Sequence, residues 1–283
     1  MKKKALVTGG SSNQSFAIGT FLVNINNVCP DIADEFVIFH DGKMPRRDMQ
    51  LMSRILPTRF IEYRLPEAVT AVLKDGAGHF TPMVFCKYEC LNLLTDYRTV
   101  VWSDYDTIVL DDISEIFNPT SPLKMLLMEN GSAKSFLHPI EEYDMDTWGM
   151  CGSLFVLQDN LENYMDMYNF CYEKLCIYCQ NLYLGEQAIF DIMLQEFSLK
   201  PERLSHSTYT PHPRDHTQYP HAKILHAYGG SKFWNGLQNT LWQKYYGQWR
   251  SMGGSAYNPV NGQALHRRIL RKLKKIFLAR HNL

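Results

Sequence analysis

The chain has 283 residues, of which 45% are hydrophobic and 20% charged, and its formal net charge at neutral pH is zero. This composition is ordinary for one large globular domain and excludes wholesale disorder. No stretch approaches the ~18 consecutive apolar residues of a membrane-spanning helix. The 7 cysteines, an odd number scattered along the chain, are typical of reduced thiols.

Short apolar runs alternate along the chain with segments of helical periodicity. Short runs bounded by glycine or polar residues predict buried strands, and apolar residues three or four apart predict helices. In chain order, these patterns predict a strand over 4–8, a helix over 11–27, a strand over 36–39, a helix over 48–56, a strand over 60–63, a helix over 82–95, strands over 100–102, 107–110 and 154–157, helices over 162–178 and 186–197, an irregular stretch over 205–221, and a strand over 223–226. Strands and helices alternating at this spacing indicate an α/β fold with a largely parallel sheet.

The N-terminus resembles the start of a signal peptide only in its first residues. Three lysines, Lys2 to Lys4, supply the basic region, but the apolar run that follows ends at Gly9 and Gly10. That run is far shorter than the core of a secretory signal. We therefore expect a cytoplasmic protein.

The strand predicted over 100–102 ends at a polar cluster that contains Asp104 and Asp106. Two carboxylates separated by one residue project to the same side of an extended backbone, where they repel each other unless a cation lies between them. A hard divalent ion bound by carboxylate oxygens meets this need, and open α/β sheets bind ligands at the carboxyl ends of their strands. A solvated turn is the alternative, because aspartate is common after strands.

A second stretch, residues 225–234, supplies groups that complement the two aspartates. His226 follows a predicted strand and can complete a metal shell through an imidazole nitrogen. Gly229 allows the backbone to approach a ligand closely, and Lys232 supplies a cation for phosphate. Together the two stretches predict a site for a metal-bridged diphosphate.

These stretches resemble the motifs of glycosyltransferase family 8, whose members include glycogenin and bacterial lipopolysaccharide galactosyl- and glucosyltransferases. The segment Asp104-Tyr105-Asp106 resembles the family's metal motif. Its C-terminal motif is matched by His226, Gly229, Lys232 and Trp234, with Phe233 in place of a proline. The resemblance covers about residues 4–235. It implies a GT-A fold, a Rossmann-like α/β domain with a mixed, mainly parallel sheet, together with a UDP-sugar donor, Mn²⁺ or Mg²⁺, and retention of anomeric configuration.

The resemblance also implies a role for each matching residue. The metal ligands would be Asp104, Asp106 and His226, and Lys232 with the Gly229 backbone would bind the diphosphate. Other nucleotide contacts are expected from Thr8, Asn13, Lys87 and Tyr105. For Lys87, an exposed lysine on a helix is an equal alternative.

Glu186 and Gln187 resemble the family's acidic residue and glutamine near the β face of the donor sugar. Gln187 could support an oxocarbenium-like transition state through its amide oxygen, and Glu186 is the alternative because a carboxylate can form a covalent glycosyl intermediate. Met150 stands where the family typically has an asparagine that contacts this sugar. The donor sugar therefore stays open between glucose, galactose and an N-acetyl sugar. The absence of this asparagine also allows an alternative function, a non-catalytic module that binds a UDP-sugar or a glycan.

The last part of the chain differs in charge from the rest. We expect a catalytic domain over 1–235 and a C-terminal helical segment over 236–283. Seven basic residues and no acidic ones lie between Arg267 and Arg280, with apolar residues on one helical face. This pattern is typical of a peripheral anchor on an anionic membrane surface. We expect this basic segment to bind the inner face of the membrane, near a glycan or lipid-linked acceptor of the lipopolysaccharide type. Docking on the protein's own acidic body is the alternative, and nothing supports nucleic-acid binding.

Overall fold

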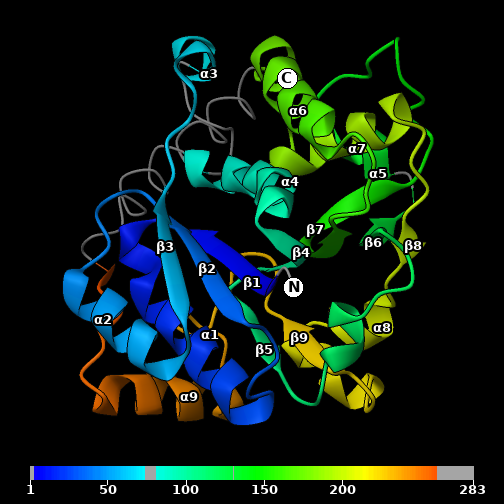
Figure 1. Cartoon of the computed structure of the whole chain (residues 1–283). Helices are drawn as coiled ribbons and strands as arrows, with labels where there is room; N and C mark the ends of the chain where they lie inside the picture. Colours follow the sequence, from blue (N-terminus) through cyan, green and yellow to red (C-terminus); the bar gives the residue numbers. More distant parts are fainter. Residues whose placement is uncertain (1–2, 74–80, 130, 260–283) are drawn as a thin grey trace, which may run out of the picture.

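A mixed sheet forms the centre of the molecule (Figure 1). The structure is a computed structural model that describes residues 3–73, 81–129 and 131–259. Within these residues the sheet has the order β3-β2-β1-β4-β7-β6-β8, and β5 and β9 form a separate ribbon. The strands are β1 (Lys3–Gly10), β2 (Glu35–His40), β3 (Thr58–Glu62), β4 (Tyr97–Ser103), β5 (Thr107–Val109), β6 (Leu123–Met128), β7 (Gly149–Gln158), β8 (Glu202–Arg203) and β9 (Ile224–His226).

The strand directions agree with the predicted mainly parallel sheet. Neighbouring strands run parallel from β3 through β2 and β1 to β4, and β8 runs parallel to β6. Only β7 runs antiparallel to its neighbours, β4 and β6, among the described strands of this sheet. The strand β4 therefore lies at the centre, with its carboxyl end open for a site.

Helices cover both faces of the sheet (Figure 1). The α-helices are α1 (Ser15–Val28), α2 (Arg46–Ile55), α3 (Glu67–Val72), α4 (Glu89–Asn92), α5 (Gly131–Ser135), α6 (Tyr164–Tyr178), α7 (Glu186–Glu196), α8 (His206–Tyr209) and α9 (Thr240–Ser251). Side chains alternate along β1, so Ala5 and Val7 enter one core with α4, α6 and α7, while Leu6 enters the other with α1, α2 and α9. Burial on both faces explains why these strands are continuous apolar runs.

The helix α9 packs directly on α1. Trp249 is fully buried, and a Cβ atom at Gly19 would lie 2.6 Å from its ring, so only glycine allows this approach. The Trp249 indole also donates a 3.0 Å hydrogen bond to the Ser255 carbonyl. The chain beyond residue 235 thus continues along the α/β core as far as it is described. The domain division at 235 stays a prediction, and the basic segment from Arg267 to Arg280 lies outside the described residues.

The sequence prediction missed the strands β6 and β8 and the helices α3 and α5, and two predicted segments take another form. The helix expected over 82–95 is a succession of short pieces, a 3₁₀-helix η2 (Pro82–Tyr88), α4 and a second 3₁₀ turn. The stretch 205–221, expected to be irregular, contains α8 and a 3₁₀-helix that begins at Pro213. Proline favours the start of a helix because its ring fixes φ and its missing N–H group is not needed there.

The 7 cysteines, all among the described residues, form no disulfide. No helix in the described ranges is long and apolar enough to span a bilayer.

Candidate active site

The β5–β9 ribbon joins the two polar stretches that the sequence singled out. Asp104 and Asp106 lie in the turn between β4 and β5, and Thr107 pairs with His226 across the antiparallel ribbon. The Thr107 hydroxyl donates to the Asp104 carbonyl at 2.6 Å, and the Ala227 amide donates to the Asp106 carbonyl at 3.0 Å. Backbone pairing therefore places the histidine against the aspartates.

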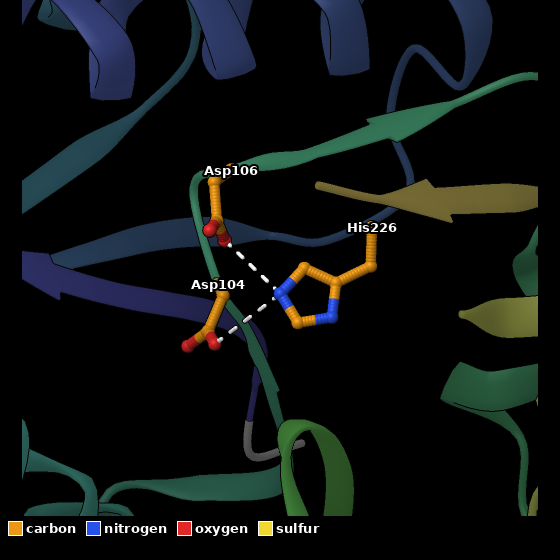
Figure 2. A group of neighbouring side chains, drawn as sticks. All are labelled: Asp104, Asp106 and His226. Carbon is orange, nitrogen blue, oxygen red and sulfur yellow. Dashed lines mark ion pairs between the residues drawn. The ribbon is translucent and has the colours of Figure 1, made fainter. Parts of the chain in front are cut away.

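The side chains of Asp104, Asp106 and His226 converge (Figure 2). One ligand atom from each lies within 4.8 Å of the others. His226 Nε2 is 3.3 Å from Asp106 Oδ1 and 4.0 Å from Asp104 Oδ2, while Nδ1 lies 3.3 Å from the Thr210 hydroxyl. The Thr210 contact orients the ring so that Nε2 faces the carboxylates. Two carboxylate oxygens and an imidazole nitrogen form a donor set that fits a divalent cation.

Lys232 and Gly229 lie on the loop that follows β9. The Lys232 ammonium group donates hydrogen bonds to Asp106 Oδ2 and to the Ala227 carbonyl. Burial alone would raise the pKa of the Asp106 carboxyl, but His226 and Lys232 outweigh it and lower the pKa well below its usual value. Gly229 has φ = 79°, a left-handed conformation that favours glycine. The structure thus brings Lys232 to the cluster, and its expected role in binding the diphosphate stays a prediction.

Lys87 is a buried residue of the same site. Its ammonium nitrogen lies 2.6 Å from Glu186 Oε1, 2.8 Å from the Gly152 carbonyl oxygen and 3.2 Å from Asp104 Oδ1. Burial lowers the pKa of Lys87, but the charges of Asp104 and Glu186 outweigh it, so the pKa is raised and the lysine stays charged. The Trp102 indole donates to Asp104 Oδ1 at 2.8 Å. The alternative of an exposed helical lysine is therefore wrong.

The strand β7 departs from β6 next to this lysine. The adjacent residues Met125 and Leu126 of β6 pair with Phe155 and Cys151 of β7, so residues 152–154 have no partner on β6. Such a bulge frees backbone groups and bends the strand. The freed groups must find other partners, because buried backbone amides and carbonyls are costly to leave unpaired.

Side chains from η2 and α7 bind the backbone that the bulge frees. The Gly152 amide donates a 2.6 Å hydrogen bond to Gln187 Oε1, and its carbonyl accepts from Lys87. Because an N–H group requires an acceptor, this contact turns the Gln187 amide oxygen toward Gly152. The amide nitrogen faces the other way and has no hydrogen-bond partner among the described residues. A Cβ atom at position 152 would lie 2.5 Å from Glu186 Oε1, so the site requires glycine there.

The chain is similar in structure to several solved glycosyltransferases. No protein-family model and no curated protein sequence matches the chain. The galactosyltransferase LgtC, solved in complex with donor and acceptor sugar analogs, superposes with a TM-score of 0.65 at 12% identity, covering 88% of this chain and 99% of LgtC. The bifunctional glycosyltransferase WbbM gives 0.64 at 13% identity over 88% of this chain and 51% of its own. The glycosyltransferase GlyE of Streptococcus pneumoniae gives 0.58 at 14% identity, over 89% of this chain and 64% of GlyE. The chain has their fold. This likeness confirms the predicted GT-A architecture.

The remaining predicted nucleotide residues lie in three different environments of the GT-A domain. Thr8 is fully buried in β1, and its hydroxyl has no hydrogen-bond partner among the described residues. Asn13 is exposed in the short 3₁₀ turn before α1. The Tyr105 ring lies against Gly10, where a Cβ atom would be 3.0 Å from the ring, and burial raises its pKa. The nucleotide contacts of these residues stay predictions.

Asp191 is a buried carboxylate that the sequence analysis missed. It lies on α7, and it accepts a 2.6 Å hydrogen bond from the Met150 amide of β7. Its other oxygen lies 2.7 Å from the Ser135 hydroxyl, which in turn lies 2.9 Å from the Gly131 carbonyl. Ser135 has one proton to donate, so a proton on Asp191 satisfies both contacts. Burial raises the pKa of Asp191 to about 7, although the hydrogen bond from the Met150 amide lowers it.

The variant Asp191→Asn is expected to gain stability over the parent protein as the pH rises from about 4 to 8. The folded carboxyl binds its proton more tightly than the unfolded one, with a pKa of about 3.9, so the parent loses unfolding free energy as pH rises between the two values. Asparagine keeps an acceptor for Met150 and a donor for Ser135 but does not titrate. Urea unfolding across this range should show the difference growing by roughly 3–4 kcal/mol. The exposed Asp111→Asn is the control, and a difference that is independent of pH would contradict the protonated state.

Proposed function

We propose that the protein is a metal-dependent, retaining glycosyltransferase that moves a hexose from a UDP-sugar to a glycan or glycolipid acceptor. The observation that carries this proposal is the convergence of Asp104, Asp106 and His226 at the carboxyl end of β4. Two carboxylates at this separation favour a bound cation, and their oxygen and nitrogen donors suit Mn²⁺ or Mg²⁺. The GT-A fold raises the expectation of nucleotide-sugar chemistry, although fold alone does not determine function.

The charged residues around the cluster suit a departing nucleotide. A divalent cation held by the two aspartates and His226 would act as a Lewis acid for the diphosphate leaving group. Lys232, which lies at Asp106, would shift part of its hydrogen bonding to phosphate oxygens and neutralise the charge that develops there. The backbone at Gly229 would allow the diphosphate to approach closely. These residues therefore stabilise the leaving group rather than the sugar.

Gln187 and Glu186 are proposed to act differently on the sugar side of the site. Glu186 is 2% exposed and bound to Lys87, which favours a role in fixing Lys87 and Asp104 over a role as a mobile nucleophile. Gln187 is partly exposed, and its amide nitrogen is the group left for a substrate oxygen. We therefore assign Gln187 to contact with the sugar, either as a hydrogen-bond donor or, after rotation of the amide, through its oxygen.

The identity of both substrates belongs to this proposal. Met150 is fully buried in the core, so its side chain supplies no polar contact that would select glucose, galactose or an N-acetyl sugar. We propose a surface-polysaccharide or lipopolysaccharide acceptor, which the segment from Arg267 to Arg280 would approach by binding an anionic membrane surface at its cytoplasmic side.

A donor screen tests the proposal. We expect the full chain to release UDP slowly from at least one of UDP-glucose, UDP-galactose and UDP-N-acetylglucosamine, with release dependent on MnCl₂ and lost in EDTA. Slow hydrolysis is expected because water can replace the acceptor. Absence of any metal effect on all three donors would contradict the enzymatic assignment. Tight UDP binding without release from any donor would instead indicate a non-catalytic UDP-sugar-binding module.

A further inference from the structure

A cluster of aromatic side chains holds the loop that carries Lys232. Three segments meet in it: the start of α1, the loop after β9, and α9 with the residues that follow it. The aromatic cluster consists of Phe16, Phe233, Trp234, Trp242, Tyr246 and Tyr257. Contacts between segments this distant in sequence fix the loop relative to the core.

Phe233, the neighbour of Lys232, has ring contacts on all three segments. Its centroid lies 4.8 Å from Trp234, 5.5 Å from Tyr246 and 6.1 Å from Phe16. It also stacks on Trp242 at 6.3 Å with an interplanar angle of 15°. Aromatic pairs at these distances stabilise one another beyond simple burial. Phe233 is therefore the main link from the loop to α9.

The loop itself is tied by hydrogen bonds between its own residues. The amides of Asn235 and Leu237 both donate to the Lys232 carbonyl at 3.0 Å, and the Asn235 side chain donates to the Gly230 carbonyl at 3.2 Å. Leu237 is buried. These backbone and Asn235 bonds connect the loop only to itself, and the Lys232 side chain reaches out of it to Asp106. The position of the loop backbone therefore depends on the residues that pack against it, and the direction of the Lys232 side chain depends on that position.

We propose that Phe233 is a positioning residue for Lys232, and that α9 thereby sets the affinity of the site for a nucleoside diphosphate. Phe233 holds the loop on the aromatic cluster, and the loop places the Lys232 ammonium group at Asp106, where the diphosphate is expected. A lysine side chain that is already ordered loses little conformational entropy when the ligand binds, so its contact with the ligand contributes more to the affinity. The inference rests on the proposed function, because Lys232 is assigned to phosphate there.

Calorimetric titration of the full chain with UDP in MnCl₂ tests the proposal through a double-mutant cycle. Phe233→Ala is expected to weaken UDP binding about tenfold, as is Lys232→Met, because each removes one well-placed charged contact. The double variant is expected to bind no more weakly than Lys232→Met alone, since Phe233 acts through that lysine. Phe233→Tyr should restore the affinity of the parent.

Tyr257→Ala is the matched control. It removes an aromatic ring from the same cluster, but that ring contacts Phe16 and not Phe233. We expect it to leave UDP affinity unchanged. If the alanine variant unfolds, Phe233→Leu replaces it: this variant keeps more of the packing and should weaken UDP binding measurably but less than tenfold.

Two results would overturn the inference while leaving the proposed function intact. One is unchanged UDP affinity in both Phe233→Ala and Phe233→Leu. The other is a loss in the double variant equal to the product of the single losses, because Phe233 would then act independently of Lys232. A parent protein that binds no UDP in MnCl₂ would contradict the proposed function itself.

Discussion

Asp106→Ala is expected to reduce metal-dependent UDP release by about a thousandfold or more. Asp106 offers one oxygen to His226 and the other to Lys232, so the substitution removes a proposed metal ligand and the partner of the Lys232 ammonium group together. A loss of about 4 kcal/mol of leaving-group stabilisation corresponds to this factor. Initial rates of UDP release, measured over a range of MnCl₂ concentrations, give both the rate and the apparent metal affinity.

Asp111→Ala is the control for this experiment. Asp111 is exposed and follows the same strand, β5, but it lies at the end of the ribbon away from His226. We expect UDP release to stay within a factor of two of the parent rate. Activity of Asp106→Ala within tenfold of the parent, at saturating metal, would show that the cluster does not carry the reaction.

Lys87→Met is expected to lower the free energy of unfolding by about 3–5 kcal/mol near neutral pH. The substitution leaves Glu186 buried without its counter-charge and the Gly152 carbonyl without its donor. Burial already raises the pKa of Glu186, so without the lysine the carboxyl is expected to bind a proton, and the loss of stability should shrink at acidic pH. Urea unfolding at pH 5 and pH 8 measures both effects.

A second variant distinguishes two causes of the lost stability: the broken ion pair and the changed packing at position 87. Combining Lys87→Met with Glu186→Gln removes the uncompensated charge and should recover much of the lost stability, because replacing both members of a buried pair costs far less than removing one. A double variant as unstable as Lys87→Met would show that packing, and not the buried charge, is responsible.

The residues of the cluster formed by Asp104, Asp106 and His226 could be predicted because each lies next to a strong local signal. Asp104 and Asp106 follow a short apolar strand, and His226 ends another. Most strands and helices were predicted for the same reason, since hydrophobic periodicity is a property of neighbouring residues, but β6, β8, α3 and α5 were missed. The pairing of Thr107 with His226 was not predicted, because nothing local to either strand specifies its partner.

The burial of Lys87 could not be read from helical periodicity. It lies in η2, a 3₁₀-helix in which four consecutive residues, Phe85 to Tyr88, are all buried. An amphipathic α-helix over 82–95 has one exposed face, so this pattern places Lys87 in solvent. The hydrogen bonds of Lys87 also depend on the β7 bulge, which leaves the Gly152 carbonyl free to accept one from the lysine.

Asp191 was missed for a related reason. Its partners, Met150 and Ser135, lie 41 and 56 positions away in sequence, and one of them is a backbone amide, for which the sequence carries no signal. An aspartate in an amphipathic helix is ordinarily solvated. Phe233 was noted only as a departure from a motif, because its ring contacts come from α1 and α9, at opposite ends of the described chain.

The β5–β9 ribbon determines when the cluster can exist during synthesis of the protein. The two aspartates leave the ribosome well before His226, and only the pairing of Thr107 with His226 brings the imidazole to them. A nascent chain that stops short of β9 therefore holds two of the three side chains of the cluster, and it lacks the loop with Lys232 as well. Under the proposed function, partly made or proteolytically shortened copies would bind a cation only weakly and would not consume a nucleotide sugar. The order of the chain would then delay the proposed activity until the domain is complete.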